Sequence, residues 1–346
     1  MSKVLVTGGA GYIGTVLTKE LVQKGYDVRV FDRLYFGREP LKELEKRIEI
    51  VQGDIRTPSE SVLEGISSVI HLAGFSNDPM AEFNPKVNME MNVDGTKILA
   101  EACARIGINR FTYASSASIY DKGTRGSVEL QDEKSDVEPK AAYSISKYKG
   151  EQKLLEVMNK YEEFCPVILR QGTVYGYSPR MRFDLVVNTF VKEAFLNGAL
   201  NVFCQGSQWR PLVDVKDVSR AHITCMEADK ELVRGQIFNV ASSNYQVMDL
   251  AHRVKYALKD IKDLLVNVDY KEDRVDRSYR ISGKKLEEML GFRYLVSVGD
   301  SAKDMAERIE GGEFPDLNDP KYYNIKWIEL LSDMHERLEE MGGSVF

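Results

Sequence analysis

The glycine-rich segment VTGGAGYIG near the N-terminus constrains the fold most strongly. It joins the apolar run KVLVT to a helix-like segment and places Gly8, Gly11 and Gly14 at three-residue spacing. Between a strand and a helix, such glycines permit a tight turn, a close approach of backbone to a pyrophosphate and close helix–strand packing. Free N–H groups at the helix start attract phosphate oxygens. The segment therefore predicts a dinucleotide site, and we expect Tyr12 and Ile13 to contribute to it.

Strand-like and helix-like segments alternate through the first half of the chain. The expected strands cover residues 3–7, 27–32, 47–54, 68–74, 110–116 and 165–170, and the expected helices cover residues 12–24, 87–106 and 143–161. Nearly continuous apolar strands with helices between them are typical of a parallel sheet that is covered on both faces. The pattern predicts an α/β fold with a doubly wound parallel sheet, the Rossmann architecture.

The rhythm of the sequence changes after Arg170, where loops become richer in Arg, Pro and Gly. We expect residues 1–172 to form a dinucleotide-binding domain and residues 173–346 to form mainly a smaller C-terminal lobe that binds the substrate. The chain is expected to cross back to the first domain near residues 212–240. Helical spacing over residues 322–341 predicts a last helix that closes the fold.

Composition argues against several classes of function. The formal net charge is −6 and no basic patch is present, which argues against nucleic-acid binding. No run reaches the ~18 apolar residues of a membrane helix, and no secretory leader is apparent, so we expect a cytoplasmic protein. The four cysteines lie far apart without a C-x-x-C pair, and the four histidines are scattered, so no metal site is expected.

Other candidate cofactor contacts follow the second, third and fourth expected strands. Asp32 ends the second strand, where an acid accepts from ribose hydroxyls and repels a 2′-phosphate, so NAD is favoured over NADP. Arg33 follows directly and could face a 2′-phosphate instead. Asp54 and Ile55 are candidates to flank the adenine. The fourth strand ends in small residues that let a cofactor pass; these candidates are Leu72, Ala73 and Gly74. His71 precedes them and is expected to be a core histidine.

The segment YSISK predicts the chemistry. It places Tyr143 and Lys147 four residues apart, on one face of a helix. A free phenol titrates near pH ~10, but a neighbouring ammonium and the positive nicotinamide ring favour phenolate. Tyr143 can then take a proton from a sugar hydroxyl while hydride leaves the adjacent carbon.

As a set, these motifs resemble those of the extended short-chain dehydrogenase/reductases in the nucleotide-sugar epimerase/dehydratase family, UDP-glucose 4-epimerases included. The similar stretches are TGGAGYIG, GDI, HLAG, NVDGT, SSASIY, YSISK, LRQGTVYG and WRPLVDVKDV. The resemblance implies NAD held throughout turnover, Tyr143 as acid/base, Lys147 on the nicotinamide ribose and Asn92 at the cofactor site. The family's catalytic hydroxyl falls on Ser116, with Ser115 as the alternative. It also implies a homodimer that pairs through the helices at residues 87–106 and 143–161.

The resemblance carries over to the substrate side only in part. It implies a nucleotide-diphosphate sugar, with Asn188 and Arg210 on the diphosphate and Arg277, or Arg274 under another alignment, as a second phosphate arginine. Further candidate contacts are Ser76, Asn77, Ser116, Thr173 and Arg182. Thr173 and Asp214 stand where the family usually has Asn and His. The segment SPRMRFDLVVN resembles a branch that includes enzymes oxidising GDP-heptoses at C4.

Three functions agree with these motifs to different degrees. The leading hypothesis is an NAD-dependent nucleotide-sugar 4-epimerase, in which C4 is oxidised and then reduced on its other face. The first alternative is a 4-dehydrogenase or 4-ketoreductase with net redox change. The third is a protein that binds NAD without chemistry. It is disfavoured because such proteins tend to lose the Tyr or the Lys, and this chain keeps both. The family's 4,6-dehydratases carry an Asp-Glu pair directly after the catalytic hydroxyl residue, whereas Ala117 and Ser118 stand here.

Overall fold

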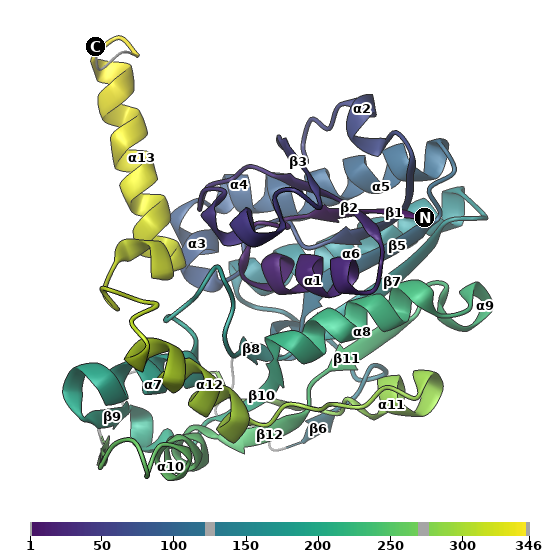
Figure 1. The fold of residues 1–346 in the computed structure, drawn as a ribbon. Coiled ribbons are helices and arrows are strands. Elements are labelled where there is room, and N and C mark those ends of the chain that lie inside the picture. Colours follow the sequence, from purple (N-terminus) through teal and green to yellow (C-terminus); the bar gives the residue numbers. More distant parts are fainter. Residues whose placement is uncertain (1, 122–128, 269–276, 344–346) are drawn as a thin grey trace.

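A seven-stranded parallel sheet forms the centre of the protein (Figure 1). The computed structural model describes residues 2–121, 129–268 and 277–343. In spatial order the strands are β11 (Ile237–Val240), β7 (Cys165–Gln171), β5 (Arg110–Ser116), β4 (Ile66–His71), β1 (Lys3–Thr7), β2 (Asp27–Asp32) and β3 (Glu49–Gln52). This order confirms the predicted Rossmann fold. The chain reverses its direction of winding between β1 and β4, and the carboxyl ends of strands at such a switch point form a ligand crevice.

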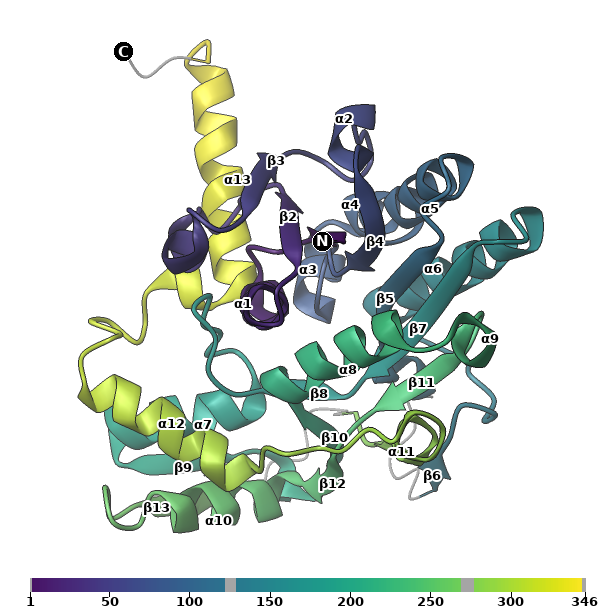
Figure 2. The same cartoon turned by 45° about the vertical axis from the view of Figure 1, so that its right-hand side comes forward.

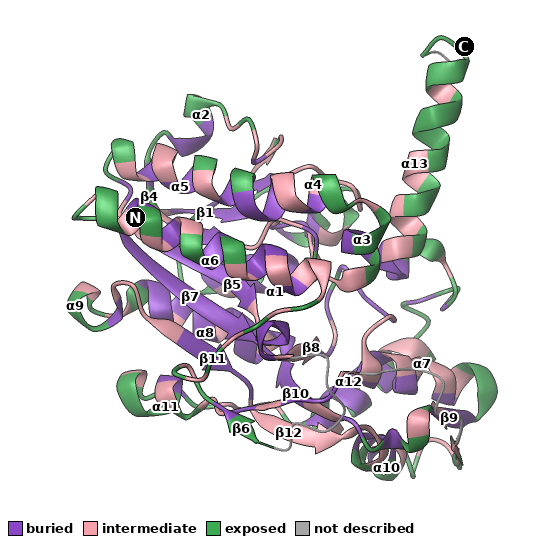
Figure 3. Ribbon diagram, turned by 180° about the vertical axis from the view of Figure 1, so that it is seen from behind, coloured by how far each residue is buried: buried purple, intermediate pink, exposed green. Residues whose placement is uncertain are grey.

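Helices cover both faces of the sheet (Figures 1 and 2). Helices α1 (Tyr12–Gln23) and α8 (Val215–Glu227) lie on one face, and α5 (Thr96–Arg105) and α6 (Ala142–Lys160) lie on the other. Side chains alternate along β1, so Val4 and Val6 pack with Leu21 of α1, whereas Leu5 packs with Leu154 of α6. Figure 3 shows the strands buried between these two layers.

One expected helix is interrupted. The segment 87–106 was predicted as one helix, but α4 (Pro85–Met89) passes into a π-helical turn at Glu90–Gly95 before α5 begins. The wider turn directs the buried Asn92 away from the helix, where its amide donates to the carbonyl of Phe75 and to Ser146. Such turns are rare and often occur at functional sites. Apolar periodicity does not predict this interruption.

The second lobe is built from small sheets and helices. Its main sheet has the order β12 (Ser243–Gln246), β10 (Trp209–Asp214) and β8 (Thr173–Tyr175), where β10 pairs in parallel with β8 and antiparallel with β12. Two smaller sheets pair β9 (Ala199–Val202) with β13 (Leu265–Val268), and β6 (Leu130–Gln131) with β14 (Arg280–Ile281). Helices α7 (Val186–Asn197), α10 (Val247–Ala257) and α12 (Val298–Glu310) enclose its core.

The chain passes back to the main sheet after β10. Helix α8 packs against α1, and β11 becomes the edge strand beside β7. Short helices complete the described chain: α2 (Glu60–Leu63), α3 (Asp78–Phe83), α9 (Lys230–Val233) and α11 (Lys284–Leu290). Within the described residues, no helix is both long enough and apolar enough to cross a bilayer.

The last helix, α13 (Asn324–Glu340), forms as predicted but does not close the fold. Only its first turns contact the body of the protein, and the rest projects away from it (Figures 1 and 3). Asn324 is its one buried residue, and Leu330 and Met334 are exposed. The expectation of a closing helix was wrong because helical periodicity predicts the helix but not the surface it packs against.

Candidate active site

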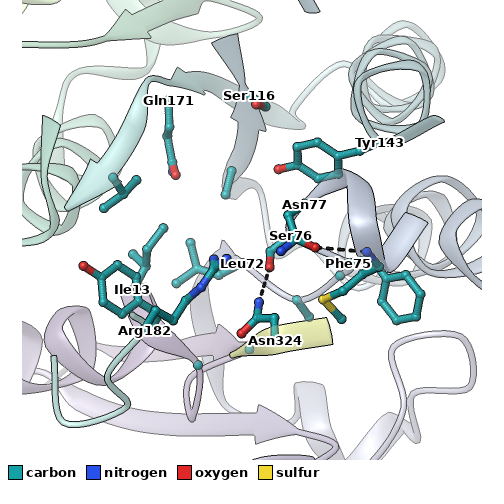
Figure 4. Close-up of a pocket in the computed structure, with 18 of the residues that line it drawn as sticks. Ile13, Leu72, Phe75, Ser76, Asn77, Ser116, Tyr143, Gln171, Arg182 and Asn324 are labelled. Carbon is teal, nitrogen blue, oxygen red and sulfur yellow. Dashed lines mark hydrogen bonds between the residues drawn. The ribbon is translucent and has the colours of Figure 1, made fainter. Parts of the chain in front are cut away.

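A cavity of about 460 Å³ lies at the carboxyl ends of β1, β4 and β5, between the sheet and the second lobe. Its size is typical of ligand sites. The predicted residues that line it are Gly8, Gly11, Tyr12, Ile13, Gly14, Asp32, Ile55, Leu72, Ala73, Gly74, Ser76, Asn77, Ser116, Tyr143, Lys147, Thr173, Arg182 and Arg277. Figure 4 shows Ser116 and Tyr143 on one side of this space and Arg182 and Asn324 on the other. The structure therefore brings the predicted cofactor, catalytic and substrate residues together.

The glycine loop has the geometry of a dinucleotide turn. Gly8 has a φ of +72°, and a Cβ there would lie 2.8 Å from the backbone N of Ala73. A Cβ on Gly14 would lie 2.1 Å from the carbonyl oxygen of Gly8. Gly11 is the N-cap of α1 and donates to Gly8 O at 3.0 Å. Without side chains here, the first turn of α1 is open to phosphate oxygens.

Asp32 is held at the end of β2 by two backbone donors. Its Oδ2 accepts from Ala10 N at 3.0 Å and its Oδ1 accepts from Leu34 N at 2.7 Å. Burial raises the pKa of the carboxyl, and these two donors oppose that shift. The acid is thus fixed beside the glycine loop, where a cofactor ribose needs an acceptor.

Arg33 lines the cavity, but its charge is already paired with a carboxylate and is not open for a 2′-phosphate, which was one alternative. Its Nη1 pairs with Asp54, and its guanidinium lies 4.9 Å from the ring centre of Tyr35. Asp54 also accepts from Arg56 at 2.7 Å. Burial opposes ionisation of Asp54, but the bonds from Arg56 and the charge of Arg33 lower its pKa to about 2. Asp54 does not line the cavity, although Gly53 and Ile55 beside it do. Its side chain holds the two arginines, and its predicted role in flanking the adenine stays a prediction.

Ser116, Tyr143 and Lys147 converge where β5 ends and α6 begins. Ser116 is the last residue of β5, and Tyr143 lies in the first turn of α6, so both line the cavity. The Nζ of Lys147 donates to the carbonyl of Ala114 at 2.9 Å and lies 5.0 Å from the ring centre of Tyr113. Ser115, the alternative catalytic hydroxyl, instead donates to Glu151 at 2.5 Å. This arrangement favours Ser116 as the hydroxyl that meets the substrate.

The protonation of the site differs from the sequence-based expectation. Burial raises the pKa of Tyr143 to about 12, although a hydrogen bond from Ser116 and the charge of Arg182 lower it. Burial lowers the pKa of Lys147 to about 8, and Glu151 opposes that shift. Desolvation therefore dominates the pKa of Tyr143 in the free protein, and the expected lowering by Lys147 is not seen there. A low phenol pKa needs a further positive charge, which an oxidised nicotinamide supplies when NAD is bound.

A buried ionic network that the motifs did not predict supports Lys147. Glu151 lies one helical turn beyond Lys147 and pairs with Arg170 of β7 through both guanidinium Nε and Nη2. Arg170 Nη1 also donates to Tyr120 Oη at 2.7 Å. The spacing of Glu151 from Lys147 was visible in the sequence, since residues i and i+4 share a helix face. Its partner on a distant strand was not.

Three predicted contacts lie outside the cavity wall. Asn92 is fully buried and donates to Phe75 O and Asn88 Oδ1. Asn188 is also fully buried; it accepts from Gly176 N and donates to the Arg182 carbonyl at 2.8 Å. Arg210 donates to the carbonyls of Trp209 and Arg277. In the structure Asn92 and Asn188 hold the backbone of the walls, and Arg210 supports the segment that carries Arg277. Their expected contacts with cofactor or substrate stay predictions.

His71 behaves as a core histidine, as expected. Hydrogen bonds join its Nδ1 to Thr7 Oγ1 at 2.6 Å and its Nε2 to Thr96 Oγ1 at 3.0 Å. Burial, and then the charge of Lys147, lower its pKa to about 3. The ring is therefore neutral and has no free nitrogen for catalysis.

The polar groups on the substrate side are paired across the cavity wall. Arg182 donates from Nε and Nη2 to Asp184, at 2.8 and 3.1 Å. Arg277 pairs with Asp78, and its Nε lies 3.5 Å from Asp121. Arg274, the alternative to Arg277, lies outside the described residues.

Two further residues of the cavity were not predicted. Asn324, at the start of α13, donates to Ser76 Oγ at 2.8 Å (Figure 4). Arg180 donates to Asn324 Oδ1 at 2.5 Å and is almost fully buried. These residues come from the loop before α7 and from the C-terminal helix, 144 positions apart in sequence. No local pattern indicated that they would meet.

The fold and the site together define a dinucleotide-dependent enzyme of the short-chain dehydrogenase/reductase type. The fit to NAD rests on the open glycine loop, the fixed Asp32 carboxylate and the cavity that links them to Tyr143 and Lys147. The model for the "NAD dependent epimerase/dehydratase family" matches residues 4–241. The chain belongs to this family, whose cofactor is NAD, and is an enzyme that modifies nucleotide sugars.

Individual relatives agree with this assignment. The chain is 30% identical over 235 residues to a putative UDP-glucose 4-epimerase of Methanocaldococcus jannaschii, covering 66% of this chain and 75% of the relative. It is 31% identical over 255 residues to an uncharacterized UDP-glucose epimerase of Bacillus subtilis, and the match covers 70% of this chain and 77% of that relative. The solved structure of UDP-glucose 4-epimerase from Thermus thermophilus in complex with NAD superimposes with a TM-score of 0.76 at 25% identity, covering 89% of this chain and 99% of that chain.

Proposed function

We propose that this enzyme is a nucleotide-sugar 4-epimerase that oxidises C4 of the sugar transiently and reduces it on the other face. The observation that carries the proposal is the convergence of Ser116, Tyr143 and Lys147 at one wall of the cavity. NAD, when bound, supplies the acceptor and then the donor of the hydride. Because the hydride returns, the reaction has no net redox change.

The protein groups handle the proton. Tyr143 Oη takes the proton of the C4 hydroxyl as that carbon is oxidised, and it gives the proton back when the 4-keto sugar is reduced. Ser116 hydrogen-bonds the reacting oxygen and holds it next to Tyr143. Lys147 stays positively charged with help from Glu151 and favours the phenolate.

The carboxylates of the cavity favour hydride chemistry over elimination of water. Among the described residues that line it, the three carboxylates are engaged by protein donors: Asp32 by backbone N–H groups, Asp78 by Arg277 and Asp184 by Arg182. Ala117 and Ser118, which follow Ser116, are buried and carry no acid. A dehydratase needs a separate acid and base at this place, whereas an epimerase needs only Tyr143.

The substrate proposed is a nucleoside-diphosphate sugar. Arg277 and Arg182 line the cavity on the side of the second lobe and suit a diphosphate or an anionic sugar. The relatives' names suggest UDP-sugars, and the likeness of the segment around Arg180 and Arg182 to enzymes of GDP-heptoses adds GDP-sugars as candidates. The homodimer and the cytoplasmic location stay predictions.

A substrate panel tests the proposal. The purified protein is incubated with UDP-, GDP-, CDP- and dTDP-sugars, NADH absorbance is recorded, and the sugar products are identified by NMR. We expect a C4 epimer without accumulation of NADH. Stoichiometric NADH with a released 4-keto sugar would instead identify a 4-dehydrogenase. No reaction with any sugar, by a protein that binds NAD, would contradict both.

A further inference from the structure

Arg180 is a buried guanidinium that forms no ion pair with a carboxylate in the described part of the chain. It lies in the loop between β8 and α7 and is 4% exposed. Its Nη2 donates to Asn324 Oδ1, and its Cζ lies 3.5 Å from the ring centre of Phe36. Its Nε is buried and has no hydrogen-bond partner. Burying a charge in this way is costly unless a counter-charge is present for part of the time.

The other buried arginines of the described chain show the contrast. Arg29 pairs with Glu49, Arg170 with Glu151 and Arg182 with Asp184. Across the described ranges, Arg180 makes no ion pair of this kind. Burial, and then repulsion from Arg182, lower its pKa to about 9, although the charges of Asp184 and Asp32 oppose that shift. Among the described residues the guanidinium therefore lacks a carboxylate in direct contact, and it lines the cavity.

The loop that carries Arg180 is fastened to the phosphate-binding end of α1. Ser178 Oγ donates to Tyr12 O at 2.7 Å, and Tyr12 Oη donates to Gly176 O at 2.6 Å. A hydrogen bond of 2.8 Å also joins Ser178 to Thr15 of the same helix. Phe36, beneath the guanidinium, lies on the loop that follows Asp32. Arg180 thus lies on a loop that is bonded to the start of α1, and the charge of Asp32 reaches it. Dinucleotide phosphates bind at such a helix start.

We propose that Arg180 binds the pyrophosphate of the dinucleotide cofactor, so that a loop of the second lobe holds the cofactor in its site. A guanidinium suits this role because its planar donors match two phosphate oxygens. Asn324 accepts from Nη2 and so fixes the orientation of the guanidinium. The proposal requires NAD binding but not epimerisation. It can therefore fail while the proposed function stands, and it can hold if the enzyme proves not to be an epimerase.

The nucleotide-sugar substrate also carries a diphosphate. Binding measurements distinguish whether Arg180 contacts the cofactor pyrophosphate or the substrate diphosphate. Full-length protein freed of cofactor is titrated with NAD, ADP-ribose, adenosine and UDP, for the parent and for Arg180→Gln and Arg180→Lys. Arg38→Gln is the matched control, since Arg38 is an exposed arginine on the same loop as Phe36. The unfolding temperature of each protein is recorded without ligand, because Arg180 has no ion pair to lose in that state.

We expect Arg180→Gln to weaken NAD and ADP-ribose by about 10- to 100-fold, the usual effect of removing a charge-assisted hydrogen bond. Arg180→Lys should lie between the parent and Arg180→Gln, and adenosine and UDP should change less than about twofold. Arg38→Gln should leave all four affinities unchanged. Unchanged affinity for NAD and ADP-ribose would overturn the proposal. A loss confined to UDP would also overturn it and would assign Arg180 to the substrate diphosphate.

Discussion

Glu151 and Arg170 form a buried ion pair one helical turn beyond Lys147, with Nη2 of the arginine 2.7 Å from Oε2 of the glutamate. Their side chains are 2% and 4% exposed. The pair joins the catalytic helix α6 to strand β7 of the main sheet. Because Glu151 also raises the pKa of Lys147 against the effect of burial, the pair contributes both to stability and to the charge of the site.

Replacing Glu151 by Gln should affect stability and pH dependence separately. The variant leaves Arg170 buried without a counter-charge, so the free energy of unfolding should fall by about 3 kcal/mol. The pKa of Lys147 should fall further below 8, which moves the alkaline limb of the rate profile to lower pH. Denaturant unfolding and a kcat–pH profile measure the two effects. In the double variant Glu151→Leu with Arg170→Met, stability should recover while the shifted pH limb remains. Recovery of both the stability and the parent position of the alkaline limb would assign Glu151 a structural role alone.

Replacing Ser116 by Ala should slow the chemical step without weakening the binding of the cofactor. The hydrogen bond from Ser116 lowers the pKa of Tyr143, so its removal raises that pKa and moves the acidic limb of the kcat profile to higher pH. We expect kcat to fall by about 10- to 100-fold, less than for Tyr143→Phe, where about 10²- to 10⁴-fold is lost. NAD titration is the control and should be unchanged. A raised KM at constant kcat and constant pH profile would show that Ser116 only binds substrate.

Adding one methyl group at Gly14 should abolish cofactor binding or folding. The new Cβ would lie 2.1 Å from Gly8 O, and the backbone there cannot move without opening the glycine turn. Gly299, inside α12, is the matched control, because a Cβ there would lie at an ordinary 3.7 Å from its nearest neighbour. Gly299→Ala should raise stability by up to about 1 kcal/mol. Thermal unfolding with and without NAD compares the two. Normal NAD affinity in Gly14→Ala would contradict the close packing described here.

Asp214 should make stability depend on pH between about 4 and 6. Burial raises its pKa to about 6, although the bond from Ser301 and the Lys216 N–H lower it. The folded state therefore binds the proton more tightly than the unfolded state, so stability decreases as pH rises through this window. Asp214→Asn should raise the free energy of unfolding at neutral pH by on the order of 2 kcal/mol and have no such effect below pH ~4. Unfolding curves at several pH values decide this. A variant that is less stable at neutral pH would show that the ionised carboxylate is needed as the cap of α8.

Local patterns predicted the parts of the site that are formed by neighbours in sequence. Spacing alone predicts a tight turn at Gly8, Gly11 and Gly14. It also predicts that Tyr143 and Lys147 share one helix face. Arg180 and Asn324 could not be found in this way, because they meet only through the packing of the second lobe and α13. Asn188 shows a limit of motif matching, since its position in the motif did not predict its bonds to the backbone of Gly176 and Arg182. Periodicity likewise predicted α13 but not its projection from the fold.

The central claim is that hydride leaves and returns to C4 within one site. It is tested most directly with a nucleotide sugar that carries deuterium at C4, identified from the substrate panel, by NMR and mass spectrometry of the product. The account predicts a C4 epimer that retains the deuterium at C4, with no NADH released. Loss of the deuterium to solvent, or its recovery in free NADH beside a 4-keto sugar, would contradict it.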